Sequence, residues 1–251
     1  MIEINNLVKQ YGNTKVINNV SFNIEKGKMI SLIGPNGAGK STVLSMITRL
    51  SKMNEGSVMI DGIDLEKWNS KDLAKKISIL KQSNNINLRL TIRELVEFGR
   101  FPYSQGNLTD EDKKYVDEAI NYLQIKDIED KFLDELSGGQ RQRAYIAMVI
   151  AQNTEYIFLD EPLNNLDMKY CVQMMKLIRS LVDDLGKTVV TVLHDINFAS
   201  CYSDIIVAMK DGQIYKIDET EKIIEEDVLK DLYGTNFRIQ NIEDKKICVY
   251  F

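Results

Sequence analysis

The stretch from Ser31 to Leu44, SLIGPNGAGKSTVL, constrains the fold of this chain more than any other. Three glycines, a lysine and two hydroxyl residues separate two apolar runs. This pattern predicts a buried strand, a tight turn and a helix that begins near Ser41. Glycines adopt positive φ angles at low cost and leave backbone N–H groups uncovered, so the turn is suited to binding a polyanion.

The turn matches the pattern GxxxxGK[ST], which is typical of triphosphate-binding loops. A chance turn before a helix is the alternative, and the strand and helix on either side disfavour it. Lys40 is expected to reach the β- and γ-phosphates, and the Ser41 hydroxyl to ligate Mg²⁺. The predicted nucleotide contacts of this segment are Gly34, Pro35, Asn36, Gly37, Ala38, Gly39, Lys40, Ser41 and Thr42.

Two acidic residues, Asp160 and Glu161, directly follow the apolar run YIFL at 156–159. The run predicts a buried strand, and ligands of open α/β sheets bind at the carboxyl ends of strands. Phosphoryl transfer needs mainly positioning and charge neutralisation. We therefore expect Asp160 to hold Mg²⁺ and Glu161 to orient and deprotonate the attacking water. The alternative is a pair of solvated acids at a strand end.

A second glycine motif, LSGGQ at 136–140, precedes an apolar helical run. A serine before two glycines can simply cap a helix, but a helix N-terminus also binds anions. One chain then carries two phosphate-facing helix starts. This predicts a homodimer in which each nucleotide lies between the first motif of one chain and the second motif of its partner. The residues at this helix start are Ser137, Gly138, Gly139 and Gln140.

GPNGAGKST, LSGGQ and FLDEP follow one another in the order typical of the ATP-binding cassette (ABC) ATPases, and the sequence resembles this family over nearly its whole length. The resemblance implies an α/β P-loop NTPase fold with a RecA-like core, an antiparallel β subdomain and an inserted α-helical subdomain. Helical periodicity dominates from 84 to 151. We expect one cassette over 1–251, with 84–151 as the helical signature subdomain and 1–83 and 152–251 as the remainder. ATP and Mg²⁺ are the implied ligands. The resemblance also implies that Ser137, Gly138, Gly139 and Gln140 contact the ATP held by the partner protomer.

Further residues gain a role from this resemblance. Gln82 matches the glutamine that contacts Mg²⁺ and senses the membrane partner, although Lys81 replaces the usual proline. His194, the only histidine of the chain, matches the switch histidine that hydrogen-bonds the γ-phosphate. Tyr11 resembles the aromatic residue that stacks on adenine, with an ordinary strand tyrosine as the alternative. Asp167 matches the family's D-loop, although the residues before it depart from the usual pattern.

The bulk composition narrows the class of protein. The net charge of −5 argues weakly against a nucleic-acid partner, which normally meets a basic face. Apolar runs fall short of the ~20 residues of a membrane span, and the start lacks the features of a signal peptide. Together with the resemblance to ABC ATPases, this leads us to expect the chain on the cytoplasmic face of a membrane. Its expected partners are separate membrane permease subunits and, indirectly, an extracellular solute-binding protein.

The substrate follows from resemblance alone. RLTIRELVEFGRFPY (89–103) and HDINFAS (194–200) resemble the branch that serves ferric-siderophore and cobalamin importers, nearest to Gram-positive importers of catecholate siderophores such as petrobactin. We expect an ATPase subunit that energises import of an iron–siderophore complex. The alternatives are an importer subunit for cobalamin or haem, and a non-transport ABC ATPase acting on nucleic acid or ribosomes. The single cassette, without room for a long coiled coil, disfavours the last.

Overall fold

The computed structural model describes residues 1–81, 88–164 and 166–250. The chain divides into two compact units. The first combines residues 1–68 with 179–251, and the second spans 69–178. We describe each unit by itself.

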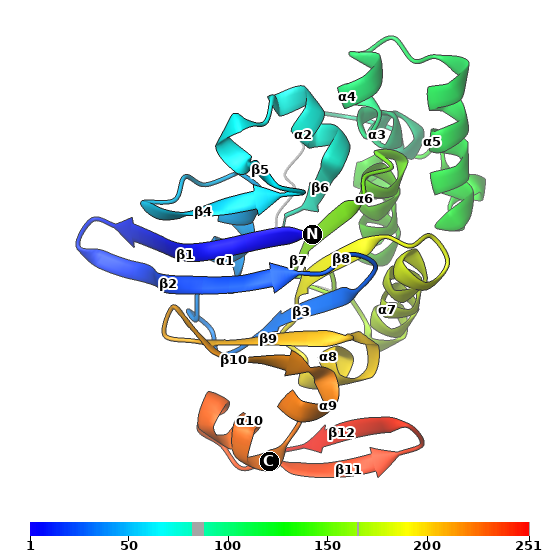
Figure 1. Ribbon diagram of the computed structural model, residues 1–251. Helices are drawn as coiled ribbons and strands as arrows, with labels where there is room; N and C mark the ends of the chain where they lie inside the picture. Colours follow the sequence, from blue (N-terminus) through cyan, green and yellow to red (C-terminus); the bar gives the residue numbers. More distant parts are fainter. Residues whose placement is uncertain (82–87, 165, 251) are drawn as a thin grey trace. The chain divides into compact units, whose positions relative to one another are not determined.

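The first unit contains a four-stranded antiparallel sheet in the order β2-β1-β4-β5 (Figure 1). Its strands are β1 (Ile2–Tyr11), β2 (Thr14–Ile24), β4 (Glu55–Ile60) and β5 (Ile63–Asp64). Ile2 lies opposite Ile24 on one side and Ile60 on the other. All three are fully buried, because alternate residues of each strand face the core. The predicted antiparallel β subdomain is confirmed.

A second sheet of this unit runs in the order β10-β9-β3-β8. Its strands are β3 (Met29–Ile33), β8 (Thr188–Val192), β9 (Ile205–Lys210) and β10 (Gln213–Glu219). β3 is parallel to both neighbours, and every residue of β3 and β8 is buried, as expected of parallel strands covered on both faces. Helix α1 (Lys40–Ile47) follows β3 through the glycine turn, so this turn lies at the carboxyl end of the strand.

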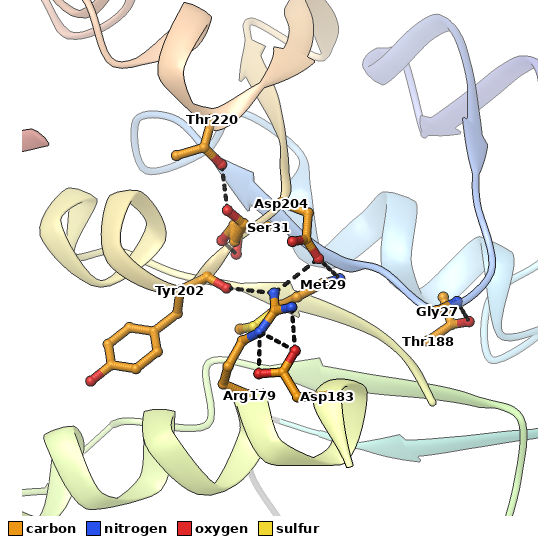
Figure 2. Close-up of polar contacts among 10 residues, drawn as sticks. Gly27, Met29, Ser31, Arg179, Asp183, Thr188, Tyr202, Asp204 and Thr220 are labelled. Carbon is orange, nitrogen blue, oxygen red and sulfur yellow. Dashed lines mark hydrogen bonds and ion pairs between the residues drawn. The ribbon is translucent and has the colours of Figure 1, made fainter. Parts of the chain in front are cut away.

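A polar network fastens the amino ends of these strands (Figure 2). Asp204 accepts hydrogen bonds from Met29 N at 2.7 Å and from Arg179 Nη1 at 2.9 Å. Arg179 also binds Asp183 at 2.6–3.0 Å and donates to the Tyr202 carbonyl at 3.1 Å. The hydrogen bonds to Asp183 and then to Asp204 raise the pKa of the guanidinium, so it stays charged. The network holds the sheet at the end opposite the glycine turn.

The first unit continues beyond the core sheet with elements that the sequence did not predict. Helix α8 (Ile196–Tyr202) follows β8, as expected, but α9 (Thr220–Ile223), α10 (Glu226–Tyr233) and the hairpin β11 (Arg238–Ile242)–β12 (Lys245–Val249) are new. Strand β12 packs along α8 (Figure 1). The C-terminal hairpin therefore covers the helix that follows His194.

The second unit joins a strand pair to a group of helices. Strands β6 (Ile77–Leu80) and β7 (Tyr156–Asp160) are parallel. The helices are α2 (Ser70–Lys76), α3 (Ile92–Phe98), α4 (Phe101–Ser104), α5 (Asp110–Tyr122), α6 (Gly138–Ala151) and α7 (Met168–Asp183), whose last residues belong to the first unit. Helices α3, α5 and α6 pack on one another and bury Leu95, Val116 and Ile146.

A buried ion pair crosses this helical packing. Arg100 Nε donates to Asp112 Oδ1 at 2.9 Å, and Arg100 Nη1 donates to the Ala151 carbonyl at 2.9 Å. Arg100 is only 3% exposed and Asp112 only 4%. The rings of Tyr103 and Tyr115 lie 3.9 and 4.3 Å from the guanidinium carbon. One side chain thus joins the segment after α3 to the start of α5 and the end of α6.

Among the helices of the described residues, none is both long and apolar enough to cross a bilayer.

Candidate nucleotide site

The glycine turn between β3 and α1 has a buried lysine at its centre. Lys40 is 5% exposed, and its ammonium donates to the carbonyls of Gly34 at 2.8 Å and Pro35 at 3.0 Å. Asn36 and Gly37 form the exposed tip of the turn, and Ser41 and Thr42 are partly exposed in the first turn of α1. The ammonium therefore lies beneath the turn, on the side of its carbonyl groups.

The glycines of this turn serve two different purposes. Gly34 has φ +143°, and a Cβ there would lie 2.0 Å from the Met209 carbonyl oxygen. Gly39 has φ +95°, and its Cβ would lie 2.3 Å from Ile17 Cδ1. Gly37 has φ +80° and no neighbour within 4 Å of a Cβ. Gly34 is thus required by packing against the backbone of β9, whereas at Gly39 the close atom is the end of a side chain and the positive φ is the main requirement. Gly37 leaves bare backbone open on the outside.

Two other predicted residues lie in the same unit. His194 is exposed and follows β8, where the Leu193 N–H donates to the Leu32 carbonyl at 3.2 Å and holds the strand end beside β3. Asp195 then begins α8 and accepts a hydrogen bond from Asn197 N at 2.8 Å. Tyr11 lies at the end of β1 with 55% of its surface exposed, as a stacking ring requires.

The carboxylate pair lies at the end of β7, in the second unit. Asp160 is the last residue of the strand and is 8% exposed. Glu161 has φ +51°, a left-handed conformation that a non-glycine residue adopts only where the surroundings enforce it. The Asn164 amide donates to Glu161 Oε2, and Asn164 N donates to the Glu161 carbonyl at 3.3 Å. The strained turn and Asn164 together fix the direction of the Glu161 carboxylate.

The LSGGQ motif begins α6 in the second unit. Ser137 is the N-cap: its Oγ accepts from Gln140 N at 3.3 Å, and Ser137 N donates to Gln140 Oε1 at 3.1 Å. Gly138 is exposed, whereas Gly139 is buried with a Cβ position 3.2 Å from the Tyr170 ring. Gln140 thus closes the helix start through its side chain, and Ser137 and Gly138 face outward.

Gln142 is a site residue that the sequence did not single out. Its Nε2 donates to the carbonyl of Pro162, directly after Glu161, at 2.8 Å. The bond ties the LSGGQ helix to the turn that carries Glu161. Asp167 is exposed and accepts from Cys171 N at 2.9 Å through its carbonyl, at the start of α7. Gln82 lies outside the described residues.

The residues present fit a triphosphate and Mg²⁺. The open backbone at Gly37, with Lys40 beneath it, provides a cradle for phosphate oxygens. Mg²⁺ takes few protein oxygen ligands together with water and phosphate. The Ser41 hydroxyl in the first unit and the Asp160 carboxylate in the second are oxygen groups of the kind that it accepts. Within the described ranges, no group of three or more His, Cys, Asp or Glu side chains offers a separate metal site.

The sequence matches the family described as ABC transporter over residues 17–164. This chain belongs to the ABC transporter family. The predicted family and the predicted α/β ABC cassette are confirmed. The chain is therefore an ABC ATPase that binds ATP.

Known proteins resemble this ABC ATPase over most of its length. The petrobactin import ATP-binding protein YclP of Bacillus subtilis (strain 168) is 58% identical over 251 residues, 100% of both chains. The petrobactin import ATP-binding protein FatE of Bacillus anthracis is 50% identical over 250 residues, again 100% of both. A dimeric structure of the cassette MJ0796 with ADP and Pi has a TM-score of 0.78 at 35% identity, over 88% of this chain and 99% of that one.

Proposed function

We propose that this ABC ATPase energises import of an iron–siderophore complex, of the petrobactin type, through a separate membrane permease. The observation that carries the proposal is the full-length likeness to two Bacillus proteins whose names specify petrobactin import. The chain works at the cytoplasmic face of the membrane, together with a permease and indirectly with an extracellular solute-binding protein. Residues 84–151 form its helical signature subdomain.

Each site residue has a role that its chemistry supports. The turn amides and Lys40 bind and neutralise the β- and γ-phosphates, and Tyr11 stacks on adenine. Ser41 and Asp160 would hold Mg²⁺, which supplies charge neutralisation at the phosphates when bound. Glu161 takes a proton from the attacking water as the water oxygen bonds to the γ-phosphorus. The bond from that phosphorus to the bridging oxygen breaks at the same time and ADP leaves with the electron pair, while His194 orients the water and the γ-phosphate.

The active assembly is a homodimer. The dimeric likeness supports this proposal, as does the outward-facing helix start at Ser137 and Gly138. Ser137 of one protomer binds the γ-phosphate held by the turn of the other. Two such composite sites close on two ATP molecules and open again after hydrolysis.

The permease docks on an apolar groove in the second unit. The groove has a volume of about 320 Å³ and lies between the segment before α3 and the segment after α4, with Leu90, Phe98, Phe101 and Leu108 in its lining. Phe98 is 49% exposed and Phe101 is 56% exposed, which is unusual for such large apolar rings. Glu97 shares the lining. The groove is thus suited to a short permease helix with apolar residues and a basic one.

Uptake in cells lacking this chain tests the proposed function. Iron uptake from ferric petrobactin should fail and should return with the wild-type chain but not with Glu161→Gln. Uptake of hydroxamate siderophores, cobalamin and haem should be unchanged. Loss of one of these, with petrobactin uptake intact, would assign a different substrate.

A second experiment tests the docking surface. Phe101→Glu should abolish uptake while the purified chain still binds and hydrolyses ATP, because none of the residues that line the groove is assigned to ATP. Leu185→Glu provides a control, since Leu185 is also exposed (46%) but lies outside the groove. Unchanged uptake with Phe101→Glu would place the docking surface elsewhere.

A further inference from the structure

A paired contact joins the C-terminal hairpin to the helix that follows His194. The Cys248 N–H donates to Asn197 Oδ1 at 2.7 Å, and Asn197 Nδ2 donates to the Cys248 carbonyl at 3.2 Å. Cys248 lies in β12, and Asn197 lies in the first turn of α8. One side-chain amide therefore satisfies both backbone groups of a strand residue, which fixes the direction of α8 as well as its distance from the hairpin.

Other bonds hold α8 along the rest of its length. Ser200 Oγ donates to the Lys246 carbonyl at 2.5 Å. Lys246 lies in β12, two residues before Cys248. At the other end of the helix, Arg179 donates to the Tyr202 carbonyl at 3.1 Å (Figure 2). The side chain of Asp195 caps the start of the helix. Because His194 directly precedes this cap, the orientation of α8 determines the backbone that carries the His194 side chain.

The hairpin is itself anchored in the body of the first unit. The Tyr250 ring lies 5.5 Å from Phe237, and the Phe237 ring lies 5.9 Å from Tyr233, measured between ring centroids. The Tyr233 hydroxyl is buried without a hydrogen bond of normal geometry among the described residues. Burial raises its pKa, and the neighbouring Gly34 backbone lowers it to a smaller extent. The aromatic chain thus runs from the end of β12 to the start of the glycine turn.

We propose that Asn197 is a positioning residue for hydrolysis, through which the C-terminal hairpin holds α8 and thereby sets His194. The inference rests on the role proposed above for His194. Asn197 itself does not touch ATP. It acts by restricting the directions in which α8 can turn at its first residue, and so by keeping the His194 imidazole within reach of the γ-phosphate.

Steady-state hydrolysis by the purified chain tests this proposal. Asn197→Ala should lower kcat about tenfold and leave KM for ATP unchanged, because displaced catalytic geometry slows chemistry without weakening binding. Ser200→Ala should act in the same direction to a smaller extent. Asn241→Ala, an exposed asparagine on the other strand of the hairpin, should leave kcat unchanged.

A double-mutant cycle separates positioning from general loosening of the fold. In a His194→Ala background, measured by single turnover over hours, Asn197→Ala should cause no further loss of rate. If Asn197→Ala lowers the hydrolysis rate by the same factor with and without His194, the proposal is overturned. It is also overturned if Asn197→Ala and Ser200→Ala both keep the full kcat while His194→Ala hydrolyses ATP slowly. Full activity of His194→Ala would instead refute the role of the histidine. If Asn197→Ala lowers the melting temperature too far for assay, Ser200→Ala supports the same cycle.

Discussion

At the scale of single residues, the glycine turn shows that one motif can combine two requirements. Gly34 is required because Met209 leaves no space for a side chain, whereas Gly37 is required only by its backbone angle and its open outer face. The sequence pattern treats the two positions alike. Only the neighbouring strand, which comes from a distant part of the chain, distinguishes them.

This difference predicts losses of very different size for two alanine substitutions. Gly34→Ala should lower the melting temperature strongly and abolish ATP binding, since the backbone of β9 must move by more than 1 Å to admit a methyl group. Gly37→Ala should cost only about 1–2 kcal/mol of stability, the cost of a left-handed residue, and should weaken ATP binding. Thermal unfolding and nucleotide titration of both variants check this. Equal melting temperatures would contradict it.

Glu161 illustrates strain at a candidate catalytic residue. Its left-handed φ and the hydrogen bond from Asn164 fix the carboxylate in one direction. The sequence indicated that Glu161 acts on water, from its place after an apolar run. It gave no sign of the backbone conformation, because φ follows from the turn that Pro162 and Asn164 complete.

At the scale of elements, Arg100 connects three helices of the second unit. Arg100→Ala should destabilise the chain by about 3–5 kcal/mol, because Asp112 would remain buried without its partner. Lys113→Ala is the matched control. Lys113 pairs with Asp110 at 3.2 Å, but both are exposed, so its loss should change the unfolding free energy by less than about 1 kcal/mol. Urea unfolding measures the loss of unfolding free energy in each variant. Similar losses in Arg100→Ala and Lys113→Ala would contradict the prediction.

The same ion pair predicts how stability responds to acid. Burial would raise the pKa of Asp112, but hydrogen bonds from Thr109 and Arg100 outweigh it and lower the pKa below its usual value. The charged carboxylate therefore stabilises the fold fully above the unfolded pKa of about 3.9. This contribution should disappear as the pH falls below about 4. Urea midpoints from pH 7 to pH 3 should fall less steeply in Asp112→Asn than in the wild-type chain.

Most elements up to β10 could be predicted from the sequence, whereas the C-terminal ones could not. The runs at 29–33, 156–160 and 188–192 are continuous apolar segments, and their burial follows from composition. Strand β11 reads RIQNI and is largely exposed, so no alternation identifies it. Helix α10 buries only Leu229 and Leu232 across its eight residues. Such short elements form because they pack on α8 and on each other, which a linear pattern does not record.

At the scale of the whole molecule, the proposed homodimer predicts how mixed protomers behave. In a mixed dimer, Lys40→Ala removes the turn of one site, and Ser137→Arg on the partner removes the helix start of that same site. Each variant alone should occlude no ATP. A mixed dimer retains one composite site with both parts intact and should occlude one ATP. Purification by two different tags, in a Glu161→Gln background that stops turnover, allows the bound ATP to be counted.

A mixed dimer that occludes no ATP would contradict the shared site. Two occluded ATP molecules would also contradict it, because the site that carries both substitutions would then still hold ATP. As a control, wild-type and Glu161→Gln homodimers with the two different tags are mixed in the same way. Dimers that carry both tags then show that protomers exchange.

The burial of Cys248 has a practical consequence. Its thiol is 3% exposed, and burial raises its pKa to about 12, so very little reactive thiolate forms at pH 8. With Cys171 and Cys201 replaced by alanine, alkylation of the remaining thiol should be at least about a hundredfold slower than that of an unshielded cysteine. Asn197→Ala should speed it up. The rate of this alkylation therefore measures how often β12 separates from α8, and it can be compared with and without ATP.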